Sequence, residues 1–360
     1  MPELFWGGAE TQFRALLQGI DKERYSIKVL IEHSKREAAE DDYLFIQDHR
    51  DDIVFLEPQK KMAFLSLPQK IRCLKRTYVD LEVDRPDVIL IYGGASFLLM
   101  PWLKAKGFCV CYSDRNGENA SARQKIKNFF YRSADAIVCN SKPTFEARLH
   151  THKKVRFIPN GTRVDHEFAP SGYESDSLLM ISRVASVKNI ECAIRSLIYL
   201  PPEFSIALIG KTEDESYEEE MKQLVKELGV EGRFHFVGYS KDIRTHLERS
   251  FCTLLPSHAE GMPNAVLESW AHERPAIVSD IPANASLVDD DAMRFPCDAP
   301  DLLAKRVMDL KQAGKGFYDD LCRSYKKIVE DRYSMGKMVE RYEALFDFLS
   351  AERRQYEKRH

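Results

Sequence analysis

The chain has 360 residues, 44% of them apolar and 30% charged, and 53 basic against 56 acidic residues give a formal net charge of −3. This composition excludes fibrous and low-complexity classes, and the near-balanced charge excludes a strong overall attraction to nucleic acid. No apolar run reaches about 18 residues, so we expect no membrane-spanning helix, and the N-terminus lacks a secretory signal pattern. The eight cysteines form no Cys-x-x-Cys pair, so we expect reduced thiols in a cytoplasmic protein.

Short apolar runs alternate with amphipathic segments of helical length along the chain. The runs show little polar alternation, which is typical of strands covered on both faces, and strand–helix alternation predicts an α/β fold with parallel sheets. A single core rarely exceeds about 250–300 residues, so two such domains are expected. The expected strands are 25–31, 52–56, 87–92, 108–113, 135–140 and 155–159, then 177–182, 204–210, 233–238, 251–256, 275–279 and 293–296, with helices at 189–200, 215–228 and 302–313.

The domain boundary is expected in the polar, turn-rich stretch 160–176. We therefore assign residues 1–165 to a first Rossmann-like domain and residues 170–332 to a second. Residues 333–360 are expected to form a charged helix, which is either solvated or returns to the first domain.

A glycine pair, Gly7 and Gly8, stands close to the N-terminus. Glycines allow close approach of the backbone to a phosphate, although the pair alone is a weak signal. In a doubly wound domain such a turn follows a strand. Only the short apolar stretch 4–6 precedes it here, so we expect the first strand to be missing or curtailed.

The most informative segment spans residues 254–271. A buried strand is followed by a loop and by Pro263, which suits the first turn of a helix because proline has no N–H to leave unpaired. Amides at that helix start would bind an anion such as a diphosphate. Glu260 and Glu268 bracket the loop and can face the crevice at the carboxyl ends of the strands, where carboxylates bind vicinal hydroxyls well. An acidic residue that favours the helix dipole, together with a solvent-exposed glutamate, would explain either glutamate alone but explains the whole segment poorly.

Two cations, Arg183 and Lys188, follow the first expected strand of the second domain. At a strand–helix junction they can bind phosphate oxygens, arginine through its planar fork and lysine as a point charge. Taken alone, the two residues are better explained as solvent-exposed loop residues that bind no ligand.

Taken together, these residues resemble the GT-B glycosyltransferases of family four (glycosyl transferases group 1), over nearly the whole chain. The matching segments are Gly7 to Glu10 (N-terminal glycine loop), Ile158 to Gly161 (end of the first domain), Ser182-Arg183 with Lys188 (diphosphate pair), Phe236 to Tyr239 (nucleotide-base loop), Glu260 to Glu268 (paired glutamates, the most specific) and Arg332 to Ser334 with Arg341-Tyr342 (closing helix).

The resemblance implies two facing Rossmann-like domains and a retaining transfer from a nucleotide-diphosphate sugar, with no required cofactor and no metal ligand. Arg183 and Lys188 would neutralise the diphosphate leaving group. Glu260 would stabilise the oxocarbenium-like sugar, and Glu268 would hold the ribose hydroxyls. Family frequency favours uridine as the base. The remaining implied donor-binding residues are Gly7, Gly8, Tyr239, Gly261, Met262, Pro263, Asn264 and Ala265.

On the acceptor side, many family members carry a histidine where this chain has Ser113-Asp114-Arg115-Asn116. That run resembles a Ser-Glu-Arg-Asn variant of enzymes that build bacterial surface glycans, which makes Asp114 and Arg115 candidate acceptor-binding residues. Two basic amphipathic stretches, 60–76 and 123–132, also lie in the first domain. Such helices bind anionic membrane surfaces, which would suit a lipid-linked acceptor, and packing on the sheet explains them equally well.

The resemblance thus implies a retaining hexosyltransferase that acts on a saccharide or polyprenyl-linked acceptor in the synthesis of capsule, lipopolysaccharide or a similar glycan. It would be cytoplasmic, at the inner face of the membrane. Two alternatives stay open. A GT-B nucleotide-sugar epimerase shares the architecture and would release an altered nucleotide sugar. A non-catalytic sugar-nucleotide-binding partner subunit would fit the short N-terminus, although Arg183, Lys188, Glu260 and Glu268 argue against it.

Overall fold

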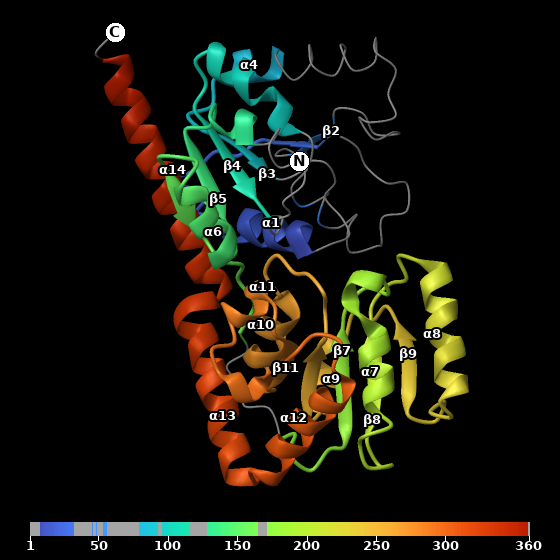
Figure 1. Ribbon diagram of the computed structural model, residues 1–360. Coiled ribbons are helices and arrows are strands. Elements are labelled where there is room, and N and C mark those ends of the chain that lie inside the picture. The colour runs from blue at the N-terminus through green and yellow to red at the C-terminus, as the bar shows by residue number, and fades with distance from the viewer. Residues whose placement is uncertain are drawn as a thin grey trace. The chain divides into compact units, whose positions relative to one another are not determined.

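A computed structural model of the chain describes residues 8–31, 45, 48, 53–55, 79–92, 96–115, 128–164 and 171–358 (Figure 1). The chain divides into two compact units, Met1–Asn160 with Met335–His360, and Gly161–Ser334. Both units contain parallel strands flanked by helices, which confirms the predicted two-domain α/β class. Residues 1–7, where the curtailed strand was expected, lie outside the described residues.

The first unit contains a four-stranded parallel sheet and a separate parallel pair of strands. The sheet has the order β3 (Ile89–Tyr92), β4 (Val110–Asp114), β5 (Ala136–Cys139) and β6 (Val155–Phe157), and the pair is β1 (Val29–Ile31) with β2 (Ile53–Phe55). The helices of this unit whose bounds lie within the described residues are α1 (Gly8–Gly19), η2 (Ser96–Leu99), α4 (Met100–Ala105), α6 (Lys142–Leu149) and α14 (Met335–Glu357).

Helices cover both faces of the four-stranded sheet. Side chains alternate along a strand; accordingly, Cys111 of β4 packs in a cluster with α1 and α14, whereas Val110 and Tyr112 pack in another with α4. The side chain of Val339 on α14 packs directly against Gly19 of α1, where an added Cβ would lie 2.7 Å from Cγ2 of Val339. The C-terminal helix α14 is therefore part of the core of the first unit.

The second unit is a six-stranded, entirely parallel sheet with helices on both faces (Figure 1). Its order is β12 (Arg294–Phe295), β11 (Ala276–Ser279), β10 (Cys252–Leu255), β7 (Ser177–Ile181), β8 (Ser205–Ile209) and β9 (Phe234–Gly238). Counted within the unit this is 6-5-4-1-2-3, the doubly wound arrangement. The helices are η3 (Ser186–Lys188), α7 (Ile190–Ser196), α8 (Glu215–Glu227), α9 (Ile243–Glu248), α10 (Asn264–Ala271), α11 (Pro282–Ala285), η4 (Asp291–Met293), α12 (Pro300–Gln312), α13 (Lys315–Ile328) and η5 (Val329–Tyr333).

All the predicted strands are present. Each is shorter than its expected range and lies inside that range or extends beyond it by a single residue. Their side chains are mostly buried because helices cover both faces of the sheets, which explains their unbroken apolar character. Strand order reverses between β7 and β10. In open α/β sheets the ligand crevice lies outside the carboxyl ends of the strands at that reversal. Among the described residues, no helix is both long and apolar enough to span a membrane.

Candidate active site

Two loops meet at the carboxyl ends of β7 and β10. The chain leaves β7 at Ile181 and reaches the short helix η3, whereas it leaves β10 at Leu255 and reaches α10. The backbone N–H of His258 donates to the carbonyl oxygen of Val187 at 2.9 Å, so the loops are joined by their own backbones. Because β7 and β10 are neighbours, the candidate residues of both loops lie at one edge of the sheet.

Lys188 and Glu260 form an ion pair across these two loops. Nζ of Lys188 lies 2.6 Å from Oε1 of Glu260, and their side chains are only 15% and 10% exposed. The expected phosphate-binding cation and the expected sugar-binding carboxylate thus lie together. The Coulomb attraction between charges shielded from water in this way is stronger than between charges at the surface.

Arg183 lies in a more exposed position of the same edge. It pairs with Glu213, and both side chains are about half exposed (54% and 52%). The two residues line a cavity of about 640 Å³ together with Ala185, Ser186 and Thr212. Gly210 lets the loops after β7 and β8 pack this closely, since an added Cβ there would lie 1.8 Å from the carbonyl oxygen of Ser182. Arg183 is therefore exposed beside this cavity, which Asp214 and Glu215 also line.

Glu268 lies one turn into α10 and is partly buried. No side chain or amide of the described residues donates a hydrogen bond to its carboxylate or forms an ion pair with it. Burial raises the pKa of Glu268 from 4.5 to about 7, because desolvation disfavours the charged form. A ligand hydroxyl that donates to this carboxylate would satisfy it and restore its charge.

The glycine-rich loop leads directly into α10. The helix begins at Asn264, and Pro263 is its N-cap residue rather than part of the first turn, with no side-chain capping bond. Gly261 and Met262 precede it, and Ala265 is the second helical residue. The first amides of a helix have no intrahelical partner and carry partial positive charge, so this segment has the local geometry of an anion site.

The remaining donor-site candidates belong to neither of these two loops. Tyr239 follows β9 and is 58% exposed, with Nζ of Lys211 4.6 Å from the centre of its ring. Gly8 is the exposed first residue of α1 in the first unit, and Gly7 lies outside the described residues. Donor binding by Tyr239, Gly7 and Gly8 stays a prediction.

Asp114 ends β4 in the first unit and Arg115 follows it, and both have partners within that unit. The Asp114 carboxylate accepts from Nε of Arg148 at 2.9 Å, and both side chains are 2% exposed. Arg115 donates to Asn160 Oδ1 at 2.5 Å and to the hydroxyl of Tyr342 at 3.0 Å. These contacts give both residues a structural role, and their contact with an acceptor stays a prediction.

The basic stretches lie largely outside the part of the chain that the structure describes. Residues 60–76 are outside it entirely, and only 128–132 of the second stretch are described. Within that part, Phe129 is 65% exposed and packs edge-on against Phe130. Membrane contact through these stretches also stays a prediction.

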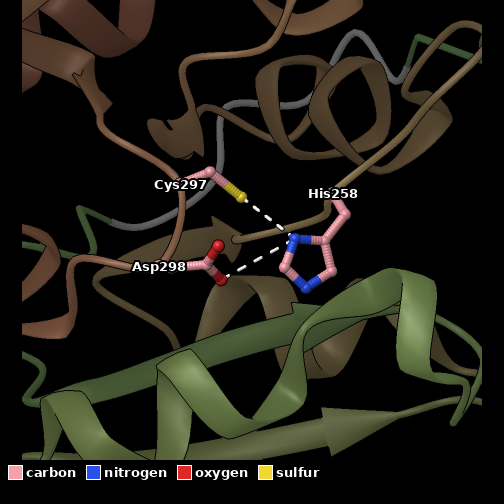
Figure 2. Close-up of side chains that lie close together, drawn as sticks. All are labelled: His258, Cys297 and Asp298. Carbon is pink, nitrogen blue, oxygen red and sulfur yellow. Dashed lines mark hydrogen bonds and ion pairs between the residues drawn. The ribbon is translucent and has the colours of Figure 1, made fainter.

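A group of metal-ligating side chains lies beside the candidate site and was not predicted. Nδ1 of His258 is 3.3 Å from Sγ of Cys297 and 3.7 Å from a carboxylate oxygen of Asp298 (Figure 2). Burial and the charge of Asp298 raise the pKa of the Cys297 thiol, so this thiol is not activated as a nucleophile. The only signal for the group in the sequence is that its members follow strands of one parallel sheet.

Comparison with known proteins places both units in known families. The family described as "Glycosyltransferase Family 4" matches residues 6–166, and the family described as "Glycosyl transferases group 1" matches residues 165–328. A lipopolysaccharide core biosynthesis glycosyltransferase, LpsE of Rhizobium meliloti, is 26% identical over 219 residues, which are 59% of this chain and 59% of the relative. An O-antigen biosynthesis glycosyltransferase, WclY of Escherichia coli, is 28% identical over 129 residues, 36% of this chain and 35% of the relative. These matches therefore cover less than two thirds of either relative.

Solved structures resemble the fold over nearly the whole chain. Anabaena Alr3699/HepE in complex with UDP and glucose has a TM-score of 0.79 at 16% identity, covering 95% of this chain and 96% of that one. The lipopolysaccharide outer core galactosyltransferase WaaB in its apo form has a TM-score of 0.71 at 16% identity, with the same coverage. At this identity the likeness establishes the two-domain fold.

Proposed function

Because the chain belongs to the GT-B glycosyltransferases of family four, we propose that it transfers a hexosyl unit from a nucleotide-diphosphate sugar to a saccharide or polyprenyl-linked saccharide acceptor. UDP is the favoured nucleotide, and a structural neighbour of 0.79 TM-score binds UDP and glucose. The product is a lipopolysaccharide, capsule or similar surface glycan, in keeping with the lipopolysaccharide core and O-antigen roles in the names of the relatives. The enzyme works in the cytoplasm, at the inner face of the membrane.

The observation that carries this proposal is the ion pair of Lys188 with Glu260 at the reversal of strand order. Arg183 lies on the same loop as Lys188, and Glu268 lies on the helix that follows the loop of Glu260. Two cations, a helix start and two carboxylates thus share one sheet edge. That set matches the chemistry of a sugar nucleotide, which carries a diphosphate, ribose hydroxyls and a sugar.

The proposed mechanism is stabilisation of the leaving group together with positioning of the donor. Arg183, Lys188 and the amides at the start of α10 neutralise the diphosphate as its bond to the sugar breaks. Glu268 accepts hydrogen bonds from the ribose hydroxyls. Glu260 contacts the sugar and stabilises the positive charge that develops on it. Transfer with retention proceeds on one face of the sugar, so no covalent nucleophile and no cofactor are required.

Thermal unfolding with UDP, GDP, ADP and CMP tests the donor site. A ligand at about 100 times its Kd stabilises the folded state by about 2.7 kcal/mol, so we expect UDP to raise the Tm of the wild-type protein. Glu268→Ala and Lys188→Ala should lose this shift. Glu220→Ala on α8 and Lys327→Ala on α13, which change exposed helical residues outside the loops after β7 and β10, should keep it. A shift that survives in both site variants would contradict the proposed site.

Product analysis with UDP-sugars then distinguishes the reactions. Transfer to an acceptor, or slow hydrolysis with the anomeric configuration kept, supports a retaining glycosyltransferase. An altered free nucleotide sugar would instead identify an epimerase. Nucleotide binding without turnover of any donor would identify a non-catalytic subunit.

A further inference from the structure

Three side chains with different ligating atoms converge at the carboxyl edge of the second unit's sheet. His258 follows β10, and Cys297 and Asp298 follow β12 (Figure 2). One ligand atom from each lies within 4.8 Å of the others. The strand β11 separates β10 from β12 in the sheet, so the cluster joins two loops whose strands are not neighbours.

The separations within this cluster fit tetrahedral zinc. Zn–S bonds of about 2.3 Å and Zn–N or Zn–O bonds of about 2.0–2.2 Å place neighbouring ligand atoms about 3.3–3.7 Å apart. The distances from His258 Nδ1 are 3.3 Å to Cys297 Sγ and 3.7 Å to Asp298 Oδ1. The Asp298 side chain is 67% exposed, and its carboxylate oxygen lies within 4.8 Å of the sulfur. The donor set of sulfur, imidazole and carboxylate suits zinc, whereas magnesium and calcium prefer oxygen ligands.

We propose that His258, Cys297 and Asp298 form a zinc site with an open fourth position. Asn189 supplies the outer contact that such sites use to orient their ligands. Its Nδ2 donates to Asp298 Oδ1 at 2.9 Å and lies 3.9 Å from Cys297 Sγ, and the residue is only 5% exposed. Asn189 has a left-handed backbone (φ 49°), a conformation that asparagine tolerates better than most residues.

The site holds the loop that carries Glu260. His258 is two residues from Glu260, and its N–H is bonded to Val187, the neighbour of Lys188. A cation bound to His258 therefore ties both loops of the candidate active site to the end of β12. The proposed role is to hold these loops in place, with water as the fourth ligand, and the inference does not depend on the proposed transferase activity.

Cobalt titration of the full chain, without nucleotide and with a non-thiol reductant, tests the site. We expect one equivalent of Co²⁺ to give a thiolate-to-cobalt charge-transfer band with tetrahedral d–d absorption, and Zn²⁺ to abolish both. Cys297→Ser should lose the thiolate band. His258→Gln and Asp298→Asn should weaken binding by at least about tenfold, the lower end of what loss of an outer contact costs.

Two control variants separate this site from other metal-binding residues. Cys73→Ser removes a thiol outside the described residues, and His150→Gln removes an exposed histidine of the first unit; both should titrate like the wild-type protein. Far-ultraviolet circular dichroism confirms that each variant is folded. An unchanged band in Cys297→Ser, or no thiolate band in the wild-type protein, would overturn the proposal. Should Cys297→Ser not fold, the tenfold loss in Asp298→Asn decides the question.

Discussion

Lys188 and Glu260 are 72 residues apart in the sequence, yet Nζ and Oε1 lie 2.6 Å apart where the strand order of the second unit reverses. In the ligand-free protein each side chain therefore neutralises the other. A diphosphate that binds Lys188 competes with Glu260 for the same ammonium group. This competition separates the roles of the two residues in a way that can be measured.

The first prediction concerns Glu260→Gln. The substitution removes the competing charge and leaves Lys188 available, so the Kd for UDP should stay the same or decrease. Transfer should fall by about 10²–10³-fold, because removal of one group that stabilises developing charge has an effect of this size. Isothermal titration calorimetry and initial rates with a UDP-sugar measure the two quantities.

Lys188→Met provides the comparison for this prediction. It should weaken UDP binding as well as transfer, and it leaves a nearly buried carboxylate without its partner, at a cost of about 1–3 kcal/mol in the free energy of unfolding. Lys188→Met combined with Glu260→Gln should recover part of that loss, because the two residues are coupled. Equal loss of UDP binding in Glu260→Gln and Lys188→Met would contradict the separation of roles.

The sequence predicted the strands well because each is an apolar run covered on both faces, as in Val110 to Tyr112, which are fully buried. It also pointed to both loops of the candidate site, since each follows such a run. The sequence did not predict which side chains contact one another. The burial of Asp114 against Arg148 and the approach of His258 to Cys297 depend on how distant segments pack, and neither pair has a diagnostic spacing.

The second prediction concerns pH. The pKa of Glu268 is about 7 in the folded protein and near 4.5 in the unfolded chain, so between these values the folded state holds a proton that the unfolded state has released. Stability should therefore decrease as the pH rises through this window. Glu268→Gln stays neutral and should lack this decrease. Chemical denaturation at several pH values measures it.

UDP binding should show the opposite trend. Ribose hydroxyls donate to the ionised carboxylate, so only protein with an ionised Glu268 makes this contact. With a pKa of about 7, that fraction and hence the affinity for UDP should increase by about tenfold between about pH 6 and pH 8. The nucleotide phosphate also titrates near the start of this range, and Glu268→Gln isolates that contribution because it retains only the phosphate effect. Identical pH profiles for the two proteins would show that Glu268 does not contact the ribose.

The third prediction assigns a structural role to Arg115. Its guanidinium lies 4.2 Å from the centre of the Tyr92 ring and donates to the hydroxyl of Tyr342, a fully buried residue of α14. Tyr342→Phe removes only that hydroxyl, so Nη2 of Arg115 loses this acceptor while Nη1 still donates to Asn160. We expect a loss of about 1.5–3 kcal/mol in the free energy of unfolding, the usual contribution of a hydrogen bond to a charged group.

Tyr325→Phe is the matched control for Tyr342→Phe. Tyr325 is also buried, but within the described residues its hydroxyl has no hydrogen-bond partner. Removal of an unpaired buried hydroxyl should leave stability unchanged or slightly higher. Chemical denaturation of both variants measures the difference, and UDP affinity should be unaffected in each. Equal stability of the two variants would show that the contact between Arg115 and Tyr342 does not hold α14 in place, and would leave Arg115 available for the acceptor role.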